Sequence, residues 1–478
     1  MIYVLTPAEM RAADAEAVAR IGVDRLMRSA GAAIAAYVRA HVPPGSRIVA
    51  FAGPGNNGGD ARAAFAQLTE YDCALYADAT LPRDDDAARA LLHGAALAID
   101  ALFGTGARLP LPANVGPAIR ALDARVLPVL AVDIPSGIDA ATGAVPGDAV
   151  RASATLTIAA MKPGLLFEPA RSFCGELWIA DIGIEEATLA RHAASFAALD
   201  DAEFLALLPA RAADADKRSA GAPLVIAGSE QFPGAAVLCA RGAARAGAGY
   251  VTVATPAKAA PALRAHLIEQ VVVHLDDDIA QIAQRNSAVA IGPGLGLDEE
   301  TGKRIRAFIE GCPLPMVIDA SGLFHLAKHL EILRGKACVV TPHEGEFARL
   351  SGEGTVRPGT RVERLRAFTS RTGITTLLKG PATLIDDGSI VHINATGTSA
   401  LATAGTGDVL TGIIATLLSR GLAPVDAARA GAYWHGLAAQ HCARERITGV
   451  LAGDLPEALG ATLRSLTPRA GALRRAYA

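Results

Sequence analysis

Residues 401–415 read LATAGTGDVLTGIIA and say more about the architecture of this chain than any other stretch. The glycine-rich turn Gly405-Thr406-Gly407 is followed by Asp408 and by an apolar run that is typical of a helix. Glycines let backbone N–H groups approach a ligand closely, and the N-terminus of a helix adds partial positive charge. These residues therefore predict an anion site, suited to a phosphate group or to the oxyanion of a transition state.

Asp408 stands at the start of this predicted helix, where a carboxylate has two interpretations. An ionised carboxylate accepts hydrogen bonds and would repel an anion bound beside it. Its position makes sense if Asp408 takes a proton from a hydroxyl while the turn holds a transferring phosphoryl group. The alternative is a helix cap after a glycine turn, which is common. Residues 401–415 alone leave both interpretations open.

The composition favours an α/β protein of two domains. At 478 residues the chain is too long for one ordinary hydrophobic core. Its hydrophobic share of 51% is typical of a compact globular protein. Its net charge of −3 gives no electrostatic reason to bind nucleic acid or an anionic membrane. Apolar runs such as 409–418 are about half as long as a membrane span, and residues 1–20 have no apolar signal-peptide core. We expect neither nucleic acid nor a membrane as a partner.

The cysteines are scattered singly and lack the spacing of metal ligands. They are Cys73, Cys174, Cys239, Cys312, Cys338 and Cys442. Isolated cysteines are typical of buried, reduced thiols in a cytoplasmic protein. We therefore expect a cytoplasmic location, with no disulfide framework and no zinc site.

The first half of the chain alternates helical and strand-like segments. A helix is expected over roughly residues 7–40, followed by strand-like runs at 47–52, 73–76, 96–100, 126–133 and 154–160. Such alternation predicts a parallel sheet with helices on both faces, and ligands on these sheets bind at the carboxyl ends of the strands. We assign residues 1–200 to this domain and the alanine-rich, acidic residues 201–216 to a linker.

The pattern restarts in the second domain, residues 217–478. Its strand-like runs are 223–227, 250–254, 288–291, 316–319, 338–340 and 375–378. The helix after the Gly405–Gly407 turn closes the series. The tail after Pro468 is short and basic, and we expect it to be frayed.

Three strand ends of the first half carry polar or glycine-rich loops: GPGNNGGD at 53–60, DALFGTG at 100–106 and DIPSG at 133–137. Asp100, Asp133 and Ser136 lie at or just beyond strand ends, where they could meet Asn57 around a cation. Carboxylate, amide and hydroxyl oxygens suit a hard monovalent or divalent ion rather than zinc. Taken singly, each aspartate could equally be a helix cap.

The second half has comparable loops: GPGLG at 292–296, TPHEGE at 341–346 and KGPAT at 379–383. His343 lies at the carboxyl end of a strand, a position that fits a ligand contact as well as a structural role. Lys379 could present its ammonium to a nucleotide phosphate or could be a solvated turn residue. Trp434 and His435, on the helix that follows, are interpreted as core or lining residues.

Assembled, these motifs resemble those of bifunctional NAD(P)H-hydrate repair enzymes over nearly the whole chain. GPGNNGGD, DALFGTG and DIPSGIDAATG are similar to the epimerase half of that family. PGAA, GPGLG, TPHEGEFARL, LKGPAT and ATAGTGDVLTGIIA are similar to its dehydratase half and stand in the expected order. The resemblance implies an N-terminal Rossmann-like parallel sheet and a C-terminal ribokinase-like α/β domain.

The resemblance also implies roles for residues of the first half. Asn57, Asp100 and Ser136 resemble potassium ligands, and Asp133 is the candidate acid/base group of the epimerase. Contacts to the hydrate are expected from two loops and one aspartate, namely Asn56, Asn57, Gly58, Gly59, Asp60, Gly104, Thr105, Gly106, Ala107, Arg108, Leu109, Pro110 and Asp133.

For the second half, the resemblance implies two further groups of residues. Hydrate contacts are expected from Ala235, Gly294, Gly296, His343 and Asp408. Nucleotide contacts are expected from two glycine-containing segments, namely Lys379, Gly380, Pro381, Ala382, Thr383, Gly405, Thr406 and Gly407.

The implied substrates are hydrated NADH and NADPH, in which water has added across a ring double bond. Phosphorylation of the new hydroxyl by ADP or ATP makes a leaving group that the lone pair of the ring nitrogen can expel. Asp408 would deprotonate the hydroxyl, while the 405–407 turn and Mg²⁺ stabilise the phosphoryl charge. The first half would interconvert the R and S hydrates, and a homo-oligomer is expected.

Several positions depart from the family pattern. Arg28-Ser29 stand in place of a Glu-Asn pair, Ala61 replaces a glycine, and the arginine after the GTG turn is displaced to Arg108. Residues 319–324 read DASGLF instead of DADALN, and residues 398–401 read TSAL instead of NPGM. Because Lys379 and Asp408 are retained, dehydratase activity is expected, and epimerase activity rests on fewer family residues.

Two other functions fit part of the sequence. A ribokinase-like kinase for a small hydroxylated metabolite would explain the Gly405–Gly407 turn but leaves the first half unexplained. A ligand-sensing or protein-binding first half would need no chemistry, and the retained Asn57, Asp100 and Asp133 argue against it.

Overall fold

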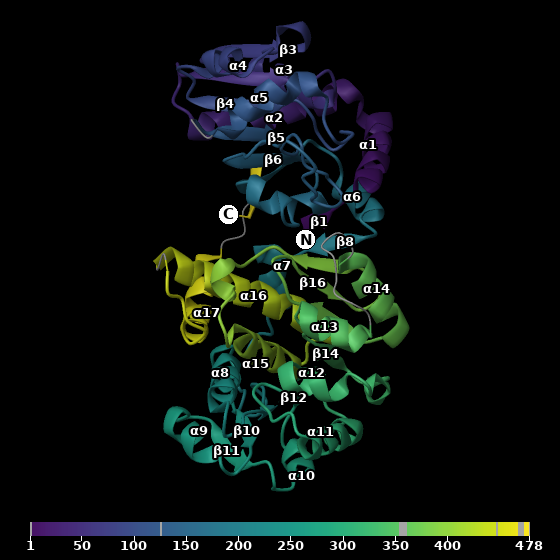
Figure 1. Ribbon diagram of the computed structural model, residues 1–478, viewed down its shortest axis with the longest axis vertical. Helices are drawn as coiled ribbons and strands as arrows, with labels where there is room; N and C mark the ends of the chain where they lie inside the picture. Colours follow the sequence, from purple (N-terminus) through teal and green to yellow (C-terminus); the bar gives the residue numbers. More distant parts are fainter. Residues whose placement is uncertain (1, 125–126, 353–360, 446–447, 467–472, 478) are drawn as a thin grey trace. The chain divides into compact units, whose positions relative to one another are not determined.

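The computed structural model describes residues 2–124, 127–352, 361–445, 448–466 and 473–477 (Figure 1). The chain forms two compact units. Unit 1 comprises residues 1–198 and 469–478, and unit 2 comprises residues 199–468. Within the described ranges, no helix has both the length and the apolar character needed to cross a bilayer.

Unit 1 is built on a seven-stranded sheet with the order β18-β7-β6-β5-β4-β2-β3. Its strands are β2 (Arg47–Ala52), β3 (Asp72–Ala77), β4 (Leu97–Ala101), β5 (Val129–Val132), β6 (Ala154–Ile158), β7 (Glu176–Ala180) and β18 (Leu473–Tyr477). Strands β2 to β7 run parallel, as expected from the alternating pattern. The expectation of a frayed tail is wrong for residues 473–477, because β18 pairs antiparallel with β7. Two short strands of this unit, β1 (Ile2–Val4) and β8 (Phe196–Ala198), pair antiparallel with each other.

The helices of unit 1 are α1 (Pro7–Ile21), α2 (Val23–His41), α3 (Asn56–Phe65), α4 (Asp85–Leu92), α5 (Gly116–Asp123) and α6 (Glu186–His192). The single helix expected over residues 7–40 is wrong, because Gly22 breaks it at φ +80° and ψ 147°. That conformation strains residues with a side chain and suits glycine. Thr6 and Glu9 form a reciprocal capping box at the start of α1, which fixes where the first helix begins.

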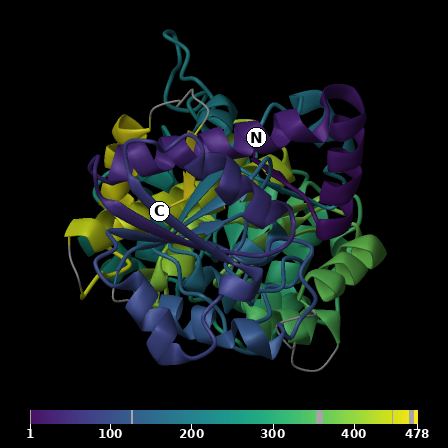
Figure 2. The same ribbon diagram turned by 90° about the horizontal axis from the view of Figure 1, so that it is seen from above.

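Both faces of the unit 1 sheet are covered by helices, which explains why both alternating sets of side chains along its strand β2 are apolar. Along β2, Ile48 and Ala50 pack into a cluster with α1, α2 and α3, whereas Val49 and Phe51 pack into a cluster with α4 and α5. Figure 2 shows the purple helices and the blue helices on opposite sides of these strands. This arrangement leaves the carboxyl ends of the strands as the place for polar loops.

Unit 2 contains a nine-strand segment of sheet with the order β17-β16-β15-β14-β13-β12-β9-β10-β11. Its strands are β9 (Pro223–Ile226), β10 (Thr252–Thr255), β11 (Val271–His274), β12 (Ala288–Ile291), β13 (Met316–Ile318), β14 (Cys338–Val340), β15 (Thr375–Leu378), β16 (Thr383–Asp386) and β17 (Val391–Asn394). Strands β9 to β15 are parallel, and β16 and β17 continue the sheet antiparallel. The last two strands and β11 were not expected from the sequence.

The helices of unit 2 are α7 (Asp201–Leu207), α8 (Pro233–Arg245), α9 (Ala260–His266), α10 (Ile279–Ala283), α11 (Glu299–Gly311), α12 (Ala320–Leu326), α13 (Glu344–Ser351), α14 (Arg361–Thr372), α15 (Thr406–Ser419), α16 (Pro424–Glu445) and α17 (Asp454–Ser465). Helix α7 lies in the stretch expected to be a linker. Its Phe204 is fully buried and packs against Tyr433 and Trp434 of α16, so this part of the stretch belongs to the core of unit 2.

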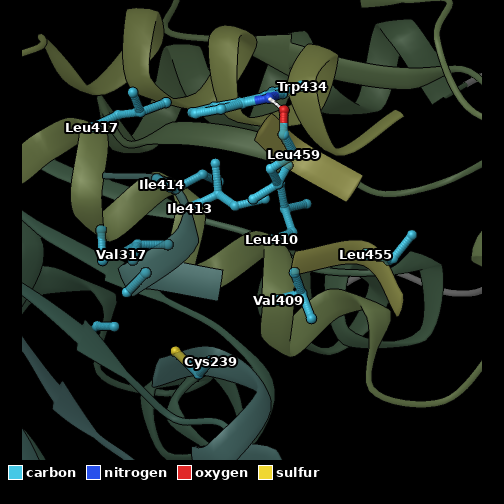
Figure 3. Packing of buried hydrophobic residues seen from close by; sticks show 14 of the residues in the cluster. Cys239, Val317, Val409, Leu410, Ile413, Ile414, Leu417, Trp434, Leu455 and Leu459 are labelled. Atoms are coloured by element: carbon cyan, nitrogen blue, oxygen red, sulfur yellow. Dashed lines mark hydrogen bonds between the residues drawn. The ribbon is translucent and has the colours of Figure 1, made fainter. Parts of the chain in front are cut away.

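Helix α15, which carries the Gly405–Gly407 turn at its start, lies in the centre of unit 2. Nearly all of its side chains from Val409 to Ser419 are buried. A Cβ added to Gly412 would overlap the carbonyl oxygen of Cys239 on α8, so glycine permits the close packing of α8 and α15. Figure 3 shows this cluster, in which Trp434 Nε1 donates to the carbonyl of Leu459 at 3.0 Å. The interpretation of Trp434 as a core residue is confirmed.

Candidate active sites

Three strand ends of unit 1 bring polar side chains together. Asp100 lies on β4, Asp133 and Ser136 follow β5, and Asn57 lies in the first turn of α3, after β2. All four side chains are buried, although polar groups usually face solvent. Strands β2, β4 and β5 are neighbours in the sheet, so the expected convergence at their carboxyl ends is present.

Asp100 and Ser136 are joined by direct hydrogen bonds. The backbone N–H and the hydroxyl of Ser136 each donate to the Asp100 carboxylate at 2.7 Å, and the N–H of Leu102 donates at 3.2 Å. Burial raises the pKa of Asp100 to about 6, even though these hydrogen bonds lower it. The hydroxyl oxygen of Ser136 accepts from the N–H of Phe103 at 3.1 Å, which holds the following loop against the same point.

The residues at this place fit a hard cation. Their donor set consists of the carboxylate of Asp100, the hydroxyl oxygen of Ser136 and the amide oxygen of Asn57, and all three side chains are buried. Oxygen donors of this kind suit K⁺, and a bound ion would also offset the cost of burying the Asp100 carboxylate. The donor chemistry therefore agrees with the ligands expected from the sequence.

Asp133 is held by a buried lysine that the sequence motifs do not contain. The Lys162 ammonium is 1% exposed and donates to Oδ1 of Asp133, to the Thr157 hydroxyl at 3.0 Å and to the Ile158 carbonyl at 2.7 Å. Burial alone would raise the pKa of Asp133, but the charge and hydrogen bond of Lys162 outweigh it and lower that pKa. Asp133 also adopts φ +66°, a strained backbone conformation for a residue with a side chain.

The 100–106 loop joins the same site through Asp133 Oδ2, which accepts from the N–H of Thr105 at 2.9 Å and also from its hydroxyl. A Cβ on Gly104 would lie 2.9 Å from Asp133 Oδ2 and 3.5 Å from Asn57 Oδ1, so glycine lets the loop approach both side chains. Residues 106–110 continue the loop, and a Cβ on Gly106 would meet nothing within 4 Å. The structure thus brings Gly104 and Thr105 to Asp133. The following residues 106–110 are exposed or only partly buried.

Asp60 completes this group of acids in unit 1. It is 8% exposed, and burial raises its pKa to about 8, with further contributions from the negative charges of Asp133 and Asp14. Asp14 on α1 was not expected near the site, and burial raises its pKa as well. A carboxyl group with a pKa near neutrality inside a strand-end site is suited to giving or taking a proton.

In unit 2, Asp408 lies in the first turn of α15, after Gly405 in the left-handed conformation at φ +89°. The pKa of Asp408 is raised to about 7. Burial is the largest cause, the negative charges of Asp319 and Glu346 also raise this pKa, and the positive charge of Lys379 lowers it. Such a group is ionised and protonated in comparable amounts near neutral pH. This favours the interpretation of Asp408 as a proton acceptor over that of a simple cap.

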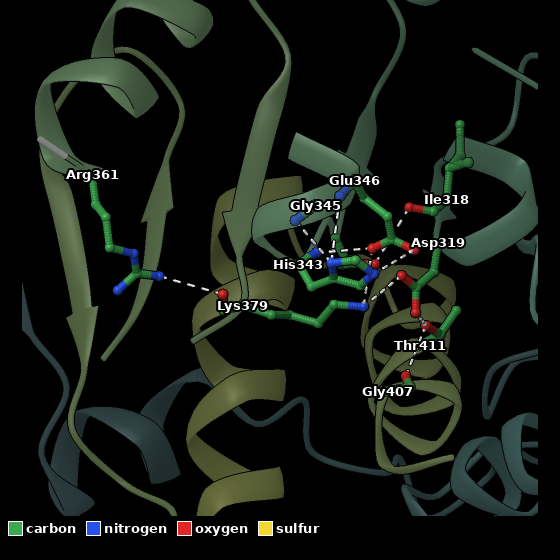
Figure 4. A network of polar contacts seen from close by, with 10 residues as sticks. Ile318, Asp319, His343, Gly345, Glu346, Arg361, Lys379, Gly407 and Thr411 are labelled. Atoms are coloured by element: carbon green, nitrogen blue, oxygen red, sulfur yellow. Dashed lines mark hydrogen bonds and ion pairs between the residues drawn. The ribbon is translucent and has the colours of Figure 1, made fainter. Parts of the chain in front are cut away.

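Lys379 links the segment 379–383 to this site (Figure 4). Its Nζ lies 2.8 Å from Asp319 Oδ1 and 3.8 Å from Glu346 Oε2. The other oxygen of Asp319 accepts from the Thr411 hydroxyl at 2.8 Å, and that hydroxyl also donates to the carbonyl of Gly407 at 3.0 Å. Burial alone would lower the pKa of Lys379, but the two carboxylates outweigh it and raise that pKa, so the lysine is a cation beside the 405–407 turn.

His343 caps α13 and leaves most of its ring exposed. The ring Nδ1 of His343 accepts from the N–H of Gly345 at 3.0 Å, and the backbone N–H of His343 donates to Glu346 Oε2 at 2.8 Å. The ring proton therefore lies on Nε2, which is 3.6 Å from Glu346 Oε1. With its side chain 61% exposed, His343 can contact a ligand while it holds the helix end.

The 292–296 loop lies against Ala235, an expected hydrate contact, and against the turn at Asp319. A Cβ on Gly294, at φ +65°, would lie 2.8 Å from the Cβ of Ala235 at the start of α8. A Cβ on Gly292 would overlap the carbonyl oxygen of Asp319. The loop thus contacts Ala235 through Gly294 and the Asp319 turn through Gly292, whereas a Cβ on Gly296 would lie 2.7 Å from Asp298 Oδ2.

Three residues at these sites escaped the sequence motifs: Lys162, Asp14 and Arg361, which donates to the carbonyl of Lys379 at 3.3 Å. Lys162 precedes Pro163-Gly164 at the end of a strand-like run, which was the available sequence cue. His435 is buried as expected, burial lowers its pKa to about 4, and its Nε2 has no partner among the described residues.

The fold and sites define an α/β enzyme with two separate centres, of which the second has a glycine turn, a lysine and an aspartate arranged for phosphoryl chemistry. Comparisons with known proteins agree. Residues 223–460 match the family model described as NAD(P)H-hydrate dehydratase, and residues 23–92 and 74–164 match the YjeF-related protein N-terminus.

Relatives extend the similarity over both units. A bifunctional NAD(P)H-hydrate repair enzyme from Pyrobaculum aerophilum is 35% identical, covering 96% of this chain and 98% of that protein. One from Mycobacterium tuberculosis is 37% identical, covering 88% and 89%. An ADP/ATP-dependent NAD(P)H-hydrate dehydratase from Bacillus subtilis, co-crystallised with ATP/Mg²⁺, is 30% identical with a TM-score of 0.51, covering 57% of this chain and 99% of that one. The chain belongs to the family of bifunctional NAD(P)H-hydrate repair enzymes.

Proposed function

We propose that this chain repairs hydrated NADH and NADPH in two reactions. Unit 1 interconverts the R and S hydrates, and unit 2 dehydrates the S hydrate at the expense of ADP or ATP. The observation that carries the proposal is the partly buried Asp408, with a pKa of about 7, beside the cationic Lys379 and a glycine turn at a helix N-terminus. The full-length similarity to repair enzymes supports the pairing of both reactions in one chain.

In unit 2, Asp408 takes the proton from the hydroxyl of the hydrate while that oxygen attacks the terminal phosphoryl group of the nucleotide. Lys379 and the backbone N–H groups of the 405–407 turn stabilise the negative charge on the phosphoryl oxygens. The phosphate then leaves with the C–O bond electrons, expelled by the lone pair of the ring nitrogen. Loss of a proton from the neighbouring carbon restores the double bond.

The acidic surroundings of Asp408 fit a cation that accompanies the nucleotide. The carboxylates of Asp319 and Glu346 both raise the pKa of Asp408, which shows that they add negative charge at this point. Mg²⁺ bound with the nucleotide would supply positive charge beside the phosphoryl group. We favour ADP as the donor in this chain, and the Bacillus subtilis dehydratase, named ADP/ATP-dependent, supports a site that admits either nucleotide.

In unit 1, Asp133 is the proposed acid/base group, oriented by Lys162 and Thr105. Asn57, Asp100 and Ser136 would hold K⁺, which would supply fixed positive charge close to the bound hydrate. Ala61, which stands where the family has glycine, is fully buried. The packing around α3 therefore accommodates the methyl group that alanine adds in place of glycine.

The test is recovery of the near-ultraviolet absorbance of NADH from a mixture of both hydrates, with ADP, ATP or no nucleotide, in Mg²⁺ and K⁺. Full recovery with a nucleotide, faster than spontaneous epimerisation allows, is the expected result and names the donor. Recovery that stops after the S hydrate is consumed would restrict the function to dehydration. No recovery with either nucleotide would overturn the proposal and favour a small-metabolite kinase. Light scattering of the same sample tests the expected homo-oligomer.

A further inference from the structure

The guanidinium of Arg361, at the start of α14, is largely buried beside the nucleotide loop. Its side chain is 16% exposed. Nε donates to Oε1 of Glu344, Nη1 donates to the carbonyl of Ala382 at 3.1 Å, and Nη2 donates to the carbonyl of Lys379 at 3.3 Å. The bond to Lys379 is drawn in Figure 4. One side chain thus ties both ends of the segment 379–382 to the helix that His343 caps.

Gly380 lies directly against the guanidinium of Arg361. A Cβ at position 380 would overlap Nη2 of Arg361 and lie 3.0 Å from the central carbon of the guanidinium. The segment can therefore lie flat against the guanidinium because residue 380 has no side chain. The missing side chain at position 380 therefore leaves the room that the Arg361 guanidinium occupies.

The direction of the hydrogen bonds determines which groups of the loop face outward. In a trans peptide bond the C=O and the N–H point in opposite directions. Because the carbonyl of Lys379 points at Arg361, the N–H of Gly380 in the same peptide bond points away from the guanidinium. Pro381 has no N–H group to offer, so the orientation of the 379–380 peptide bond decides whether this part of the loop presents a donor.

We propose that Arg361 is a positioning residue that holds segment 379–383 in the conformation that binds the nucleotide. The inference rests on the proposed function, because it assumes that this segment contacts ADP or ATP. Arg361 acts through the loop and touches neither reactant. Its planar fork reaches acceptors in three directions, whereas the single ammonium of a lysine would satisfy only some of them.

The experiment compares Arg361→Lys, Arg361→Gln and Gly380→Ala with the full-length wild type, with Arg334→Gln as the matched control. Arg334 is an exposed arginine of the same unit. We measure the KM of the nucleotide, kcat at saturating nucleotide, and the Kd of the S hydrate without nucleotide. Loss of two charge-assisted hydrogen bonds is expected to raise the nucleotide KM of Arg361→Gln by about tenfold or more. Its kcat and hydrate Kd should change less than about threefold, and Arg361→Lys should be intermediate.

Gly380→Ala is the second route to the same result, because its methyl group displaces the guanidinium without removing it. If Arg361→Gln does not fold, as judged by circular dichroism, a raised nucleotide KM in Gly380→Ala supports the proposal, and an unchanged one overturns it. A folded Arg361→Gln with wild-type nucleotide KM, or with a loss confined to kcat, also overturns it. Failure of the proposed function is distinguishable, since the wild type itself would then show no nucleotide-dependent recovery of NADH.

Discussion

The ammonium of Lys162 donates a hydrogen bond to Oδ1 of Asp133, and the lysine side chain is only 1% exposed. Each of its N–H groups has an acceptor, since the Thr157 hydroxyl and the Ile158 carbonyl take the other two hydrogen bonds. A buried ion pair adds little stability over an apolar pair, but removal of one partner leaves an uncompensated charge. Lys162 is therefore the group that allows Asp133 to be ionised inside unit 1.

Replacement of Lys162 by methionine should destabilise unit 1 by about 3–5 kcal/mol, because it leaves the Asp133 carboxylate buried without a cation. The two tryptophans separate the units, since Trp178 lies in unit 1 and Trp434 in unit 2. Urea unfolding followed by Trp178 fluorescence in a Trp434→Phe background measures the effect. Arg25→Met, at an exposed arginine of unit 1, is the control and should be neutral. The double variant Lys162→Met/Asp133→Asn should recover much of the loss, and equal instability of single and double variants would contradict this account.

Asp60→Asn should make unit 1 more stable than the wild type at alkaline pH. Burial raises the pKa of Asp60 to about 8, above the value of about 4 expected for an unfolded aspartate. A raised folded-state pKa means that the folded state binds the proton more tightly, so this stabilisation is present at low pH and is lost as the pH rises through about 8. Asparagine removes that loss.

The measurement is the urea midpoint of unit 1 at pH 6 and pH 9, again by Trp178 fluorescence. The wild type should lose about 1–3 kcal/mol more than Asp60→Asn between the two pH values. Asp24→Asn, at an exposed aspartate of the same unit, should follow the wild type. Parallel pH dependences for wild type and Asp60→Asn would show that Asp60 ionises normally.

Site residues could be predicted from the sequence where a local pattern identifies both a strand or helix and the residue at which it begins or ends. His343 and Lys379 were predicted at the carboxyl ends of strands and Asp408 at the start of a helix after a glycine turn, and the structure places Lys379 beside that turn. The β16–β17 hairpin was missed, although Asp387-Gly388 between two apolar runs is a recognisable turn pattern.

Other features were beyond the sequence because tertiary placement decides them. Lys162 and Asp133 are 29 positions apart, and a lysine is by default an exposed residue. The break at Gly22 could not be read from periodicity, because the alanine-rich pattern continues through it and glycine is tolerated in helices. Arg361 lies outside every motif, and only the fold shows that it reaches the 379–382 carbonyls.

Gly412→Ala should destabilise unit 2 by about 2–4 kcal/mol, because the added methyl group forces α15 away from α8. Its Cβ would overlap the carbonyl of Cys239 and lie 2.7 Å from the backbone nitrogen of Ala243, and neither backbone group can move freely. Gly460→Ala is the matched control, since that helical glycine has open space around it and should gain up to about 1 kcal/mol. Trp434 fluorescence in a Trp178→Phe background reports the unfolding of unit 2. If both substitutions have the same effect, the close packing of α8 and α15 is not what requires glycine.

Asp408 should set the acidic limb of the dehydratase pH profile. As a proton acceptor it works in the ionised form, and its pKa of about 7 implies that kcat falls about tenfold per pH unit below that value. Asp408→Asn should lower kcat by about 10²–10⁴ while the Kd of ADP changes little, because the amide keeps the shape of the side chain but cannot take the proton.

Glu346→Gln should shift the acidic limb of the pH profile to lower pH, since the Glu346 carboxylate raises the pKa of Asp408. The measurement is NADH recovery from the purified S hydrate between pH 5 and 9 at saturating nucleotide. A limb that stays in place in Glu346→Gln, or an Asp408→Asn enzyme within a few-fold of wild type, would show that another group takes the proton.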